Sequence, residues 1–237
     1  MIKITKKLIT RNFSKRTNFN IKYIVIHDTA NTNTGANAQA HYNYFNNNDL
    51  DKSAHYFVDD KEILQIVEDK NRAWHCGDGK GQNKITNENS IGIEICINKD
   101  GDYNKAKENT ILLSAYLLDK YNLNINDLVR HFDASGKICP NTMTSNNWED
   151  WEEFKKEVEK NLNINKIILT REKIENYVKG TYKTFLERDP EEEGFNYWTS
   201  EINNLNTLQN FVNTVLTSKE FKELNTGDQQ GNDEKRI

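Results

Sequence analysis

The sequence predicts an α/β domain followed by a smaller all-helical domain. Over residues 1–162, short β-branched apolar runs alternate with segments of helical periodicity, and beyond residue 169 only helical periodicity remains. A sheet whose strands alternate with helices buries its faces under those helices. We therefore expect two domains, at 1–162 and 170–225, joined by a linker at 163–169, and a disordered tail at 226–237.

The strands of the first domain follow from their apolar patterns. "IKYIVIH" (21–27) is a near-continuous apolar run, typical of a buried central strand. "SAHYFVDDKEILQIVED" (53–69) predicts a hairpin that turns at "DDKE". "SIGIEICIN" (90–98) alternates, so that four isoleucines share one face and Glu94 lies on the other. "LVRHF" (128–132) predicts one more short strand.

Apolar residues at helical spacing predict three helices in the first domain, at 35–46, 105–121 and 146–162. The second would bury Ile111, Leu112, Ala115 and Leu118. The third carries an apolar stripe formed by Trp148, Trp151, Phe154, Val158 and Leu162. In the second domain, apolar spacing predicts three further helices, within 170–186, 195–202 and 208–216.

The composition excludes several classes of function. The net charge is -4 and the sequence pI about 5.8, which gives no reason to expect a nucleic-acid partner. No apolar run approaches the roughly 20 residues that a membrane helix needs, so we expect no membrane insertion. No signal-peptide pattern is visible, and we expect synthesis in the cytoplasm. The three cysteines, an odd number, do not suggest a disulfide framework.

Three residues have the chemistry of a metal site. His27 and His131 each stand where an apolar strand ends, and Cys139 follows His131 across a short loop. Ligands collect at strand ends in α/β sheets. Two imidazoles and a thiolate suit zinc and leave a fourth position for water, as catalytic sites do. Their spacing matches no short zinc motif, so a thiol nucleophile or a plain polar loop stays open at this point.

Two charged residues would complete a hydrolytic mechanism. Glu94 faces away from the isoleucines and could take a proton from water near a metal. Lys137, two residues before Cys139, could stabilise an oxyanion. A lone lysine is more often simply solvated.

Five motifs in order resemble the zinc-dependent N-acetylmuramoyl-L-alanine amidases of type 2: "YIVIHDTAN", "SAHYFVDD", "AWHCGDG", "SIGIEI" and "VRHFDASGKICP". The resemblance covers residues 8–162, and the same superfamily includes peptidoglycan recognition proteins. It implies a mixed central sheet flanked by helices and one Zn²⁺ held by His27, His131 and Cys139. It also implies that Glu94 is the general acid/base and that Lys137 is catalytic.

The same resemblance suggests residues that contact substrate. Trp74 and His75 match a groove-wall motif, and His55 would line the cleft or pack beneath it. One position departs from the pattern: some members carry a catalytic tyrosine where this chain has Ala54. By alternation, Tyr56 would lie on the same strand face as Ala54, but Glu94 is the better candidate for catalysis.

The resemblance implies a reaction and a partner, bacterial peptidoglycan. The chain would hydrolyse the amide bond between N-acetylmuramic acid and L-alanine, as a phage endolysin or an autolysin that acts on the wall after release. One alternative is a peptidoglycan-binding protein of the same fold without catalysis. Another is a cysteine endopeptidase that uses Cys139 with His131.

The second domain resembles a small helical domain of poorly defined function that is found on secreted or surface proteins. The signature lies in "YKTFLERDPEEEGFNYW" (182–198), and analogy suggests attachment to the cell wall. Its aromatic residues Tyr182, Phe185, Tyr197 and Trp198 are mostly expected to form its core. Residues 189–201 partly imitate a calcium-binding loop, although the twelfth position is Ser200 rather than glutamate.

Overall fold

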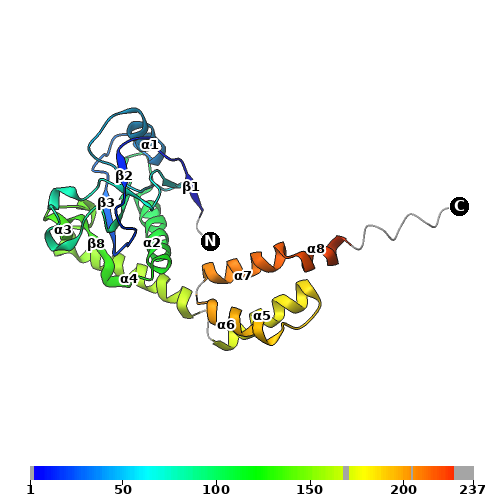
Figure 1. Cartoon of the computed structure of the whole chain (residues 1–237). Helices are drawn as coiled ribbons and strands as arrows, with labels where there is room; N and C mark the ends of the chain where they lie inside the picture. Colours follow the sequence, from blue (N-terminus) through cyan, green and yellow to red (C-terminus); the bar gives the residue numbers. More distant parts are fainter. Residues whose placement is uncertain (1–2, 168–170, 204, 227–237) are drawn as a thin grey trace. The chain divides into compact units, whose positions relative to one another are not determined.

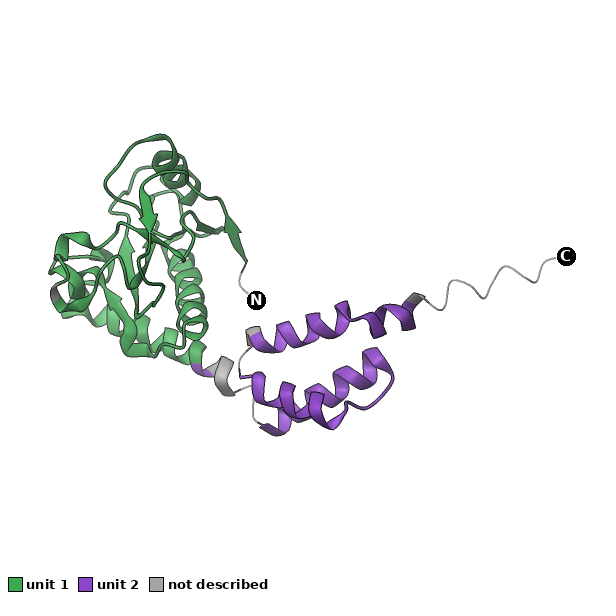
Figure 2. Ribbon diagram, viewed as in Figure 1, with its two compact units in different colours: residues 1–162 green, residues 163–237 purple. Residues whose placement is uncertain are grey.

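The computed structural model describes residues 3–167, 171–203 and 205–226. The chain divides into two compact units, residues 1–162 and 163–237 (Figure 2). The first unit contains a mixed sheet with helices, and the second is helical (Figure 1). The predicted tail, except Thr226, lies outside the described residues, as do residues 168–169 of the predicted linker.

A six-stranded mixed sheet forms the centre of the first unit, in the order β1-β5-β4-β7-β3-β8. In that order the strands are Ile4–Lys6, Ile63–Gln65, Tyr56–Val58, Ser90–Ile95, Tyr23–Asp28 and Leu128–Arg130. Neighbouring strands run parallel except β4 and β5, which form the antiparallel hairpin predicted at "DDKE". Two further strands, β2 (Phe13–Lys15) and β6 (Asn71–Ala73), pair separately.

Helices cover both faces of the sheet. On one face, α2 (Tyr103–Lys120) and α4 (Ser145–Ile167) pack against isoleucines that include Ile91, Ile93 and Ile95, as the alternation in "SIGIEICIN" predicted. On the other face, α1 (Ala38–Asn47) packs over Phe57 and Leu64. The short helix α3 (His131–Ser135) follows β8, and four 3-10 turns complete the unit: η1 Gly77–Gly79, η2 Gln82–Lys84, η3 Ile125–Asp127 and η4 Asn141–Met143.

Three sequence expectations differ from the structure. In α2, Leu112 is 41% exposed, whereas Leu113 is fully buried. The buried residues of this helix cover most of its circumference rather than one narrow apolar stripe. In α4, residues 146–148 adopt left-handed backbone angles rather than a simple cap. That helix continues to Ile167, into the segment predicted as a linker, which contains neither glycine nor proline to end it.

A further difference concerns the strand β4. Ala54 and Tyr56 were expected on the same face, but Ala54 packs in the cluster with α1 and Tyr56 packs in the opposite cluster with α2. The strand begins only at Tyr56, so the two-residue alternation does not extend back to Ala54. Tyr56 therefore faces away from the side on which Glu94 lies.

The second unit consists of α5 (Arg171–Leu186), α6 (Glu192–Glu201), α7 (Leu205–Thr217) and α8 (Lys219–Thr226). Its core comprises Ile174, Val178, Tyr182, Leu186, Ile202, Phe211 and Val215, with Phe185 and Trp198 packed against them. Tyr197 was also expected in this core but is 55% exposed, and Tyr177 of α5 is 49% exposed.

The segment that partly imitates a calcium loop has another structure. Glu192 begins α6, so the residues after it wind into a helix rather than wrapping around an ion. Glu191 forms an ion pair of 2.7 Å with Arg188. No helix within the described residues is both long and apolar enough to span a membrane.

Candidate metal centre

Three parallel strands bring the candidate residues to one edge of the sheet. His27 lies near the end of β3 and is in register with Glu94 on β7. His131 directly follows β8, which pairs with the other side of β3. The sequence had suggested that His131 ends a strand, but it is the first residue of α3. Because the carboxyl ends of parallel strands meet at one edge, residues far apart in sequence converge here.

His27, His131 and Cys139 face one another closely enough to share an ion. His27 Nδ1 lies 3.1 Å from His131 Nδ1 and 3.8 Å from Cys139 Sγ. The three donor atoms all lie within 4.8 Å of one another, and no other such group occurs among the described residues. Tetrahedral zinc with bonds of about 2.0–2.3 Å needs such donors roughly 3.3–3.6 Å apart. The donor chemistry therefore fits a zinc ion, and the distances of 3.1 and 3.8 Å from His27 Nδ1 lie on either side of that spacing.

Asp78 contacts the candidate ligand His131, and sequence reasoning did not single it out. Its Oδ1 lies 2.8 Å from His131 Nε2, and its Oδ2 accepts a hydrogen bond from Ser135 Oγ. A carboxylate in this position would hold the ring so that its opposite nitrogen is free to bind a metal. A Cβ atom on Gly79 would lie 2.2 Å from the Ala134 carbonyl oxygen, so glycine allows the Asp78 turn to approach α3.

Electrostatics favour neutral imidazoles at this site. Burial lowers the pKa of His27 well below its usual value, and the nearby His131 lowers it further. Burial also lowers the pKa of His131, although Asp78 opposes that shift. Neutral imidazole is the form that binds metals.

Glu94 is the unsatisfied acid of the site. It is partly buried, and its Oε2 atom has no hydrogen-bond partner. Burial, and secondly the charge of Asp28, raises the pKa of Glu94 to about 8. An acid with its pKa near neutrality can both accept and return a proton, and such perturbed groups gather at functional sites.

Cys139 and Lys137 differ sharply in exposure. Cys139 is buried, and that burial raises the pKa of its thiol to about 12. Both an activated nucleophile and a zinc ligand are thiolates, so without a bound cation this burial disfavours either role. Lys137 is exposed on the loop before it, and its charge opposes the upward shift of the Glu94 pKa.

The three predicted substrate contacts occupy different environments. Trp74 lines an open pocket of about 320 Å³. His75 instead contacts the candidate ligand His27 through a 3.1 Å hydrogen bond. His55 is fully buried: Gly92 N–H donates to its Nδ1, and its Nε2 lies 3.2 Å from the Asn71 carbonyl oxygen. His55 therefore has no exposed surface with which to contact a substrate.

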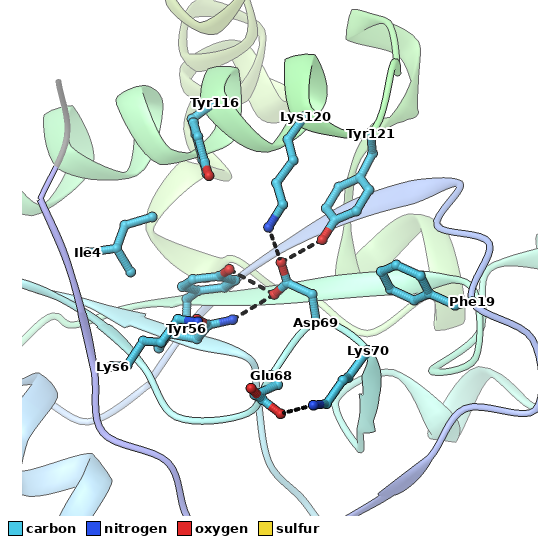
Figure 3. A pocket seen from close by; sticks show the side chains of 11 residues that line it. Ile4, Lys6, Phe19, Tyr56, Glu68, Asp69, Lys70, Tyr116, Lys120 and Tyr121 are labelled. Atoms are coloured by element: carbon cyan, nitrogen blue, oxygen red, sulfur yellow. Dashed lines mark hydrogen bonds and ion pairs between the residues drawn. The ribbon is translucent and has the colours of Figure 1, made fainter. Parts of the chain in front are cut away.

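A second pocket, of about 480 Å³, surrounds Asp69 on the other face of the sheet. Figure 3 shows Tyr56, Lys120 and Tyr121 converging on the Asp69 carboxylate. The distances from its oxygens to these three donors are 2.7, 2.8 and 2.5 Å. Gln65 donates a fourth hydrogen bond, of 2.9 Å. Burial alone would raise the pKa of Asp69, but its hydrogen bonds with Lys120 and Tyr121 hold it below the usual value.

Comparisons with known proteins agree with this architecture. The N-acetylmuramoyl-L-alanine amidases XlyA and CwlH of Bacillus subtilis (strain 168) are 43% and 40% identical over 133 and 132 residues, 56% of this chain in each case. These matches cover 42% and 50% of the two relatives, so the chain spans about half the length of the curated relatives it matches.

Solved structures match the first unit over nearly their whole length. The catalytic domain of XlyA has a TM-score of 0.60 and 38% identity, covering 66% of this chain and 99% of that one. The structure of PlyL has a TM-score of 0.57 and 32% identity, covering 68% and 99%.

Two families match separate parts of the chain. Residues 169–225 match a family described only as a domain of unknown function, DUF4214. Residues 17–142, more than half of the chain, match the family described as N-acetylmuramoyl-L-alanine amidase. With the sheet, the converging ligand set and these matches together, the chain belongs to the N-acetylmuramoyl-L-alanine amidase family.

Proposed function

We propose that this chain is a zinc hydrolase that cleaves the amide bond between N-acetylmuramic acid and L-alanine in bacterial peptidoglycan. The observation that carries the proposal is the convergence of His27, His131 and Cys139 at the strand edge where Glu94 also lies. The names of the amidase relatives support the substrate class. A solved endolysin from Bacillus subtilis, 40% identical with a TM-score of 0.58, supports a role as a phage endolysin or an autolysin.

Each site residue has a definite task in this hydrolysis. When bound, zinc supplies the Lewis acidity that activates water and polarises the scissile carbonyl. Glu94 accepts a proton from the attacking water as the new carbon–oxygen bond forms. It then returns that proton to the alanine nitrogen as the carbon–nitrogen bond breaks. The Lys137 ammonium stabilises the negative charge that develops on the carbonyl oxygen.

Substrate recognition and wall attachment belong to parts of the chain outside the ligand set. Trp74 lies in an open pocket with Arg72, Lys80 and Glu88, so its indole contacts the glycan or the stem peptide. The helical second unit attaches the enzyme to the wall. Equal retention on cell walls by the full chain and by a variant ending at residue 162 would refute that second role.

The decisive experiment identifies the bond that is cut. Purified peptidoglycan is digested with the full chain, and mass spectrometry of the products is combined with detection of new N-terminal alanine. The proposal expects free stem peptides beginning with alanine and intact glycan strands. Cleavage within the peptide would support an endopeptidase, and binding without cleavage by zinc-loaded protein would support the non-catalytic alternative.

Inhibition separates the zinc and thiol mechanisms. A zinc amidase loses activity with a strong chelator and regains it when zinc is added. A cysteine endopeptidase using Cys139 with His131 survives chelation and is inactivated by alkylation instead. Activity that persists without metal would therefore remove zinc from the mechanism.

A further inference from the structure

A chain of four groups leads from the candidate metal centre to a backbone carbonyl. His27 Nε2 lies 3.1 Å from His75 Nδ1. His75 Nε2 lies 3.1 Å from Ser90 Oγ, which donates a 2.6 Å hydrogen bond to the Thr86 carbonyl oxygen. At the other end, His27 Nδ1 faces His131 and Cys139.

The end of this chain fixes the direction of every hydrogen bond in it. The Thr86 carbonyl can only accept, so it takes the single hydroxyl proton of Ser90. Ser90 Oγ must then accept from His75, which places the one N–H of a neutral His75 ring on Nε2. His75 Nδ1 is consequently an acceptor and takes the Nε2 proton of His27.

This order leaves His27 Nδ1 without a proton. That nitrogen carries the lone pair, and it is the atom that lies next to His131 and Cys139. A histidine that binds a metal needs its other ring nitrogen held by a hydrogen-bond partner, which sets both the tautomer and the ring orientation. For His131 that partner is Asp78.

The position of His75 is itself tightly constrained. Its backbone N–H donates a 3.0 Å hydrogen bond to Asn87 Oδ1. Its ring packs on Gly92, where an added Cβ atom would lie 2.5 Å from the ring Cγ. His75 and His27 meet edge to face, with interplanar angle 88°. Glycine on the site-facing side of β7 therefore makes room for the imidazole.

We propose that His75 is a positioning residue that holds His27 in its metal-binding tautomer, through a relay anchored by Ser90 on the Thr86 carbonyl. This inference rests on the proposed zinc site and reassigns His75 from substrate contact to support of a ligand. The relay accounts for a histidine that points toward the ligand set while its neighbour Trp74 faces the open pocket.

The test measures zinc affinity, by competition with a chromophoric chelator, alongside kcat and KM of the full chain. His75→Ala is expected to weaken zinc binding about 10- to 100-fold. His75→Asn is the matched control, because the asparagine Oδ1 atom can occupy the place of the imidazole Nδ1 and accept from His27. We expect His75→Asn to bind zinc with most of the wild-type affinity. Its cobalt-substituted form should have the absorption spectrum of the cobalt-substituted wild type.

Two further variants keep the test decisive. Gly92→Ala displaces the ring without removing it and should weaken zinc binding in the same direction. Trp74→Ala should raise KM and leave zinc affinity unchanged. Wild-type zinc affinity in His75→Ala, with a raised KM, would overturn the inference and return His75 to substrate contact while the proposed amidase function stands. Wild-type protein that binds no zinc would overturn the zinc assignment and this inference together.

Discussion

Asp69 and Glu94 are carboxylates on opposite faces of one sheet, and they differ in the groups that surround them. Asp69 accepts hydrogen bonds from four donors, and its pKa is lowered. Glu94 has a buried oxygen without any partner, and burial raises its pKa to about 8. Desolvation acts on both groups, so the difference lies in the donors and charges that face each one: Lys120 beside Asp69, and Asp28 beside Glu94.

The larger of the two pockets does not lie at the candidate metal centre. The pocket beside Asp69, about 480 Å³, is larger than the one of about 320 Å³ beside Trp74. Every oxygen of Asp69 is occupied by protein donors, so its network stabilises the fold. Glu94 retains an unused acceptor in register with the candidate ligand His27, and unpaired buried polar groups of this kind cluster at functional sites.

The largest expected effect comes from replacing the unpaired acid. Glu94→Gln keeps the shape of the side chain but removes the proton acceptor, so kcat should fall by about 10²- to 10⁴-fold. Bound zinc, measured by elemental analysis, should stay stoichiometric. Asp69→Asn is the matched control and should change kcat little. Full activity of Glu94→Gln would remove Glu94 from the mechanism.

The next effect concerns the exposed cation of the site. Lys137→Ala should lower kcat by about 10²-fold, with a smaller change in KM, because charge stabilisation is needed mainly in the transition state. Lys137→Arg should recover part of the lost rate, since it keeps the charge with a different shape. Steady-state kinetics on a soluble muramyl peptide would check both values. An unchanged kcat in Lys137→Ala would identify Lys137 as an ordinary solvated residue.

A smaller effect is expected on stability from the satisfied carboxylate. Asp69→Ala leaves the buried Tyr56 hydroxyl without its acceptor and should lower the free energy of unfolding by about 1–3 kcal/mol. Chemical denaturation measures this loss. In a double-mutant cycle, Tyr56→Phe should cost less in the Asp69→Ala background than in the wild type. Strictly additive losses would show that the hydrogen bond contributes nothing.

The smallest expected effect is a pH dependence of the free energy of unfolding, to which Asp69 and Glu94 contribute with opposite signs. Because the pKa of Asp69 is lower in the folded protein than in the unfolded chain, Asp69 stabilises the fold at a pH above its unfolded-state pKa. That stability is lost as the pH falls through its folded-state pKa. Because the pKa of Glu94 is raised to about 8 in the folded protein, its contribution to stability is fully present below its unfolded-state pKa of 4.5. That contribution is lost as the pH rises toward about 8.

Metal-free protein provides the measurement. Its free energy of unfolding should fall by about 1–2 kcal/mol between roughly pH 6.5 and 8, a window above the usual histidine pKa. The same fall should be reduced in Glu94→Gln and retained in Asp69→Asn. Parallel curves for wild type and Glu94→Gln would contradict the shifted pKa of Glu94.

The sequence by itself determined the parts of the molecule that follow local rules. Alternation in "SIGIEICIN" placed the isoleucines and Glu94 on opposite faces, because side chains alternate along a strand. Helical spacing identified the apolar core of α4 and the helix α5. The five motifs indicated the family and the set formed by His27, His131 and Cys139, which the structure brings together.

Only the tertiary structure decided which partners these residues have. Asp78 reaches His131 across 53 positions, His75 reaches His27 across 48, and Lys120 reaches Asp69 across 51. Periodicity reports the face on which a side chain lies, but it contains no information about which distant loop packs against that face. The contacts of Asp78 and His75, and the contrast between Asp69 and Glu94, therefore arise from packing between segments rather than from local pattern.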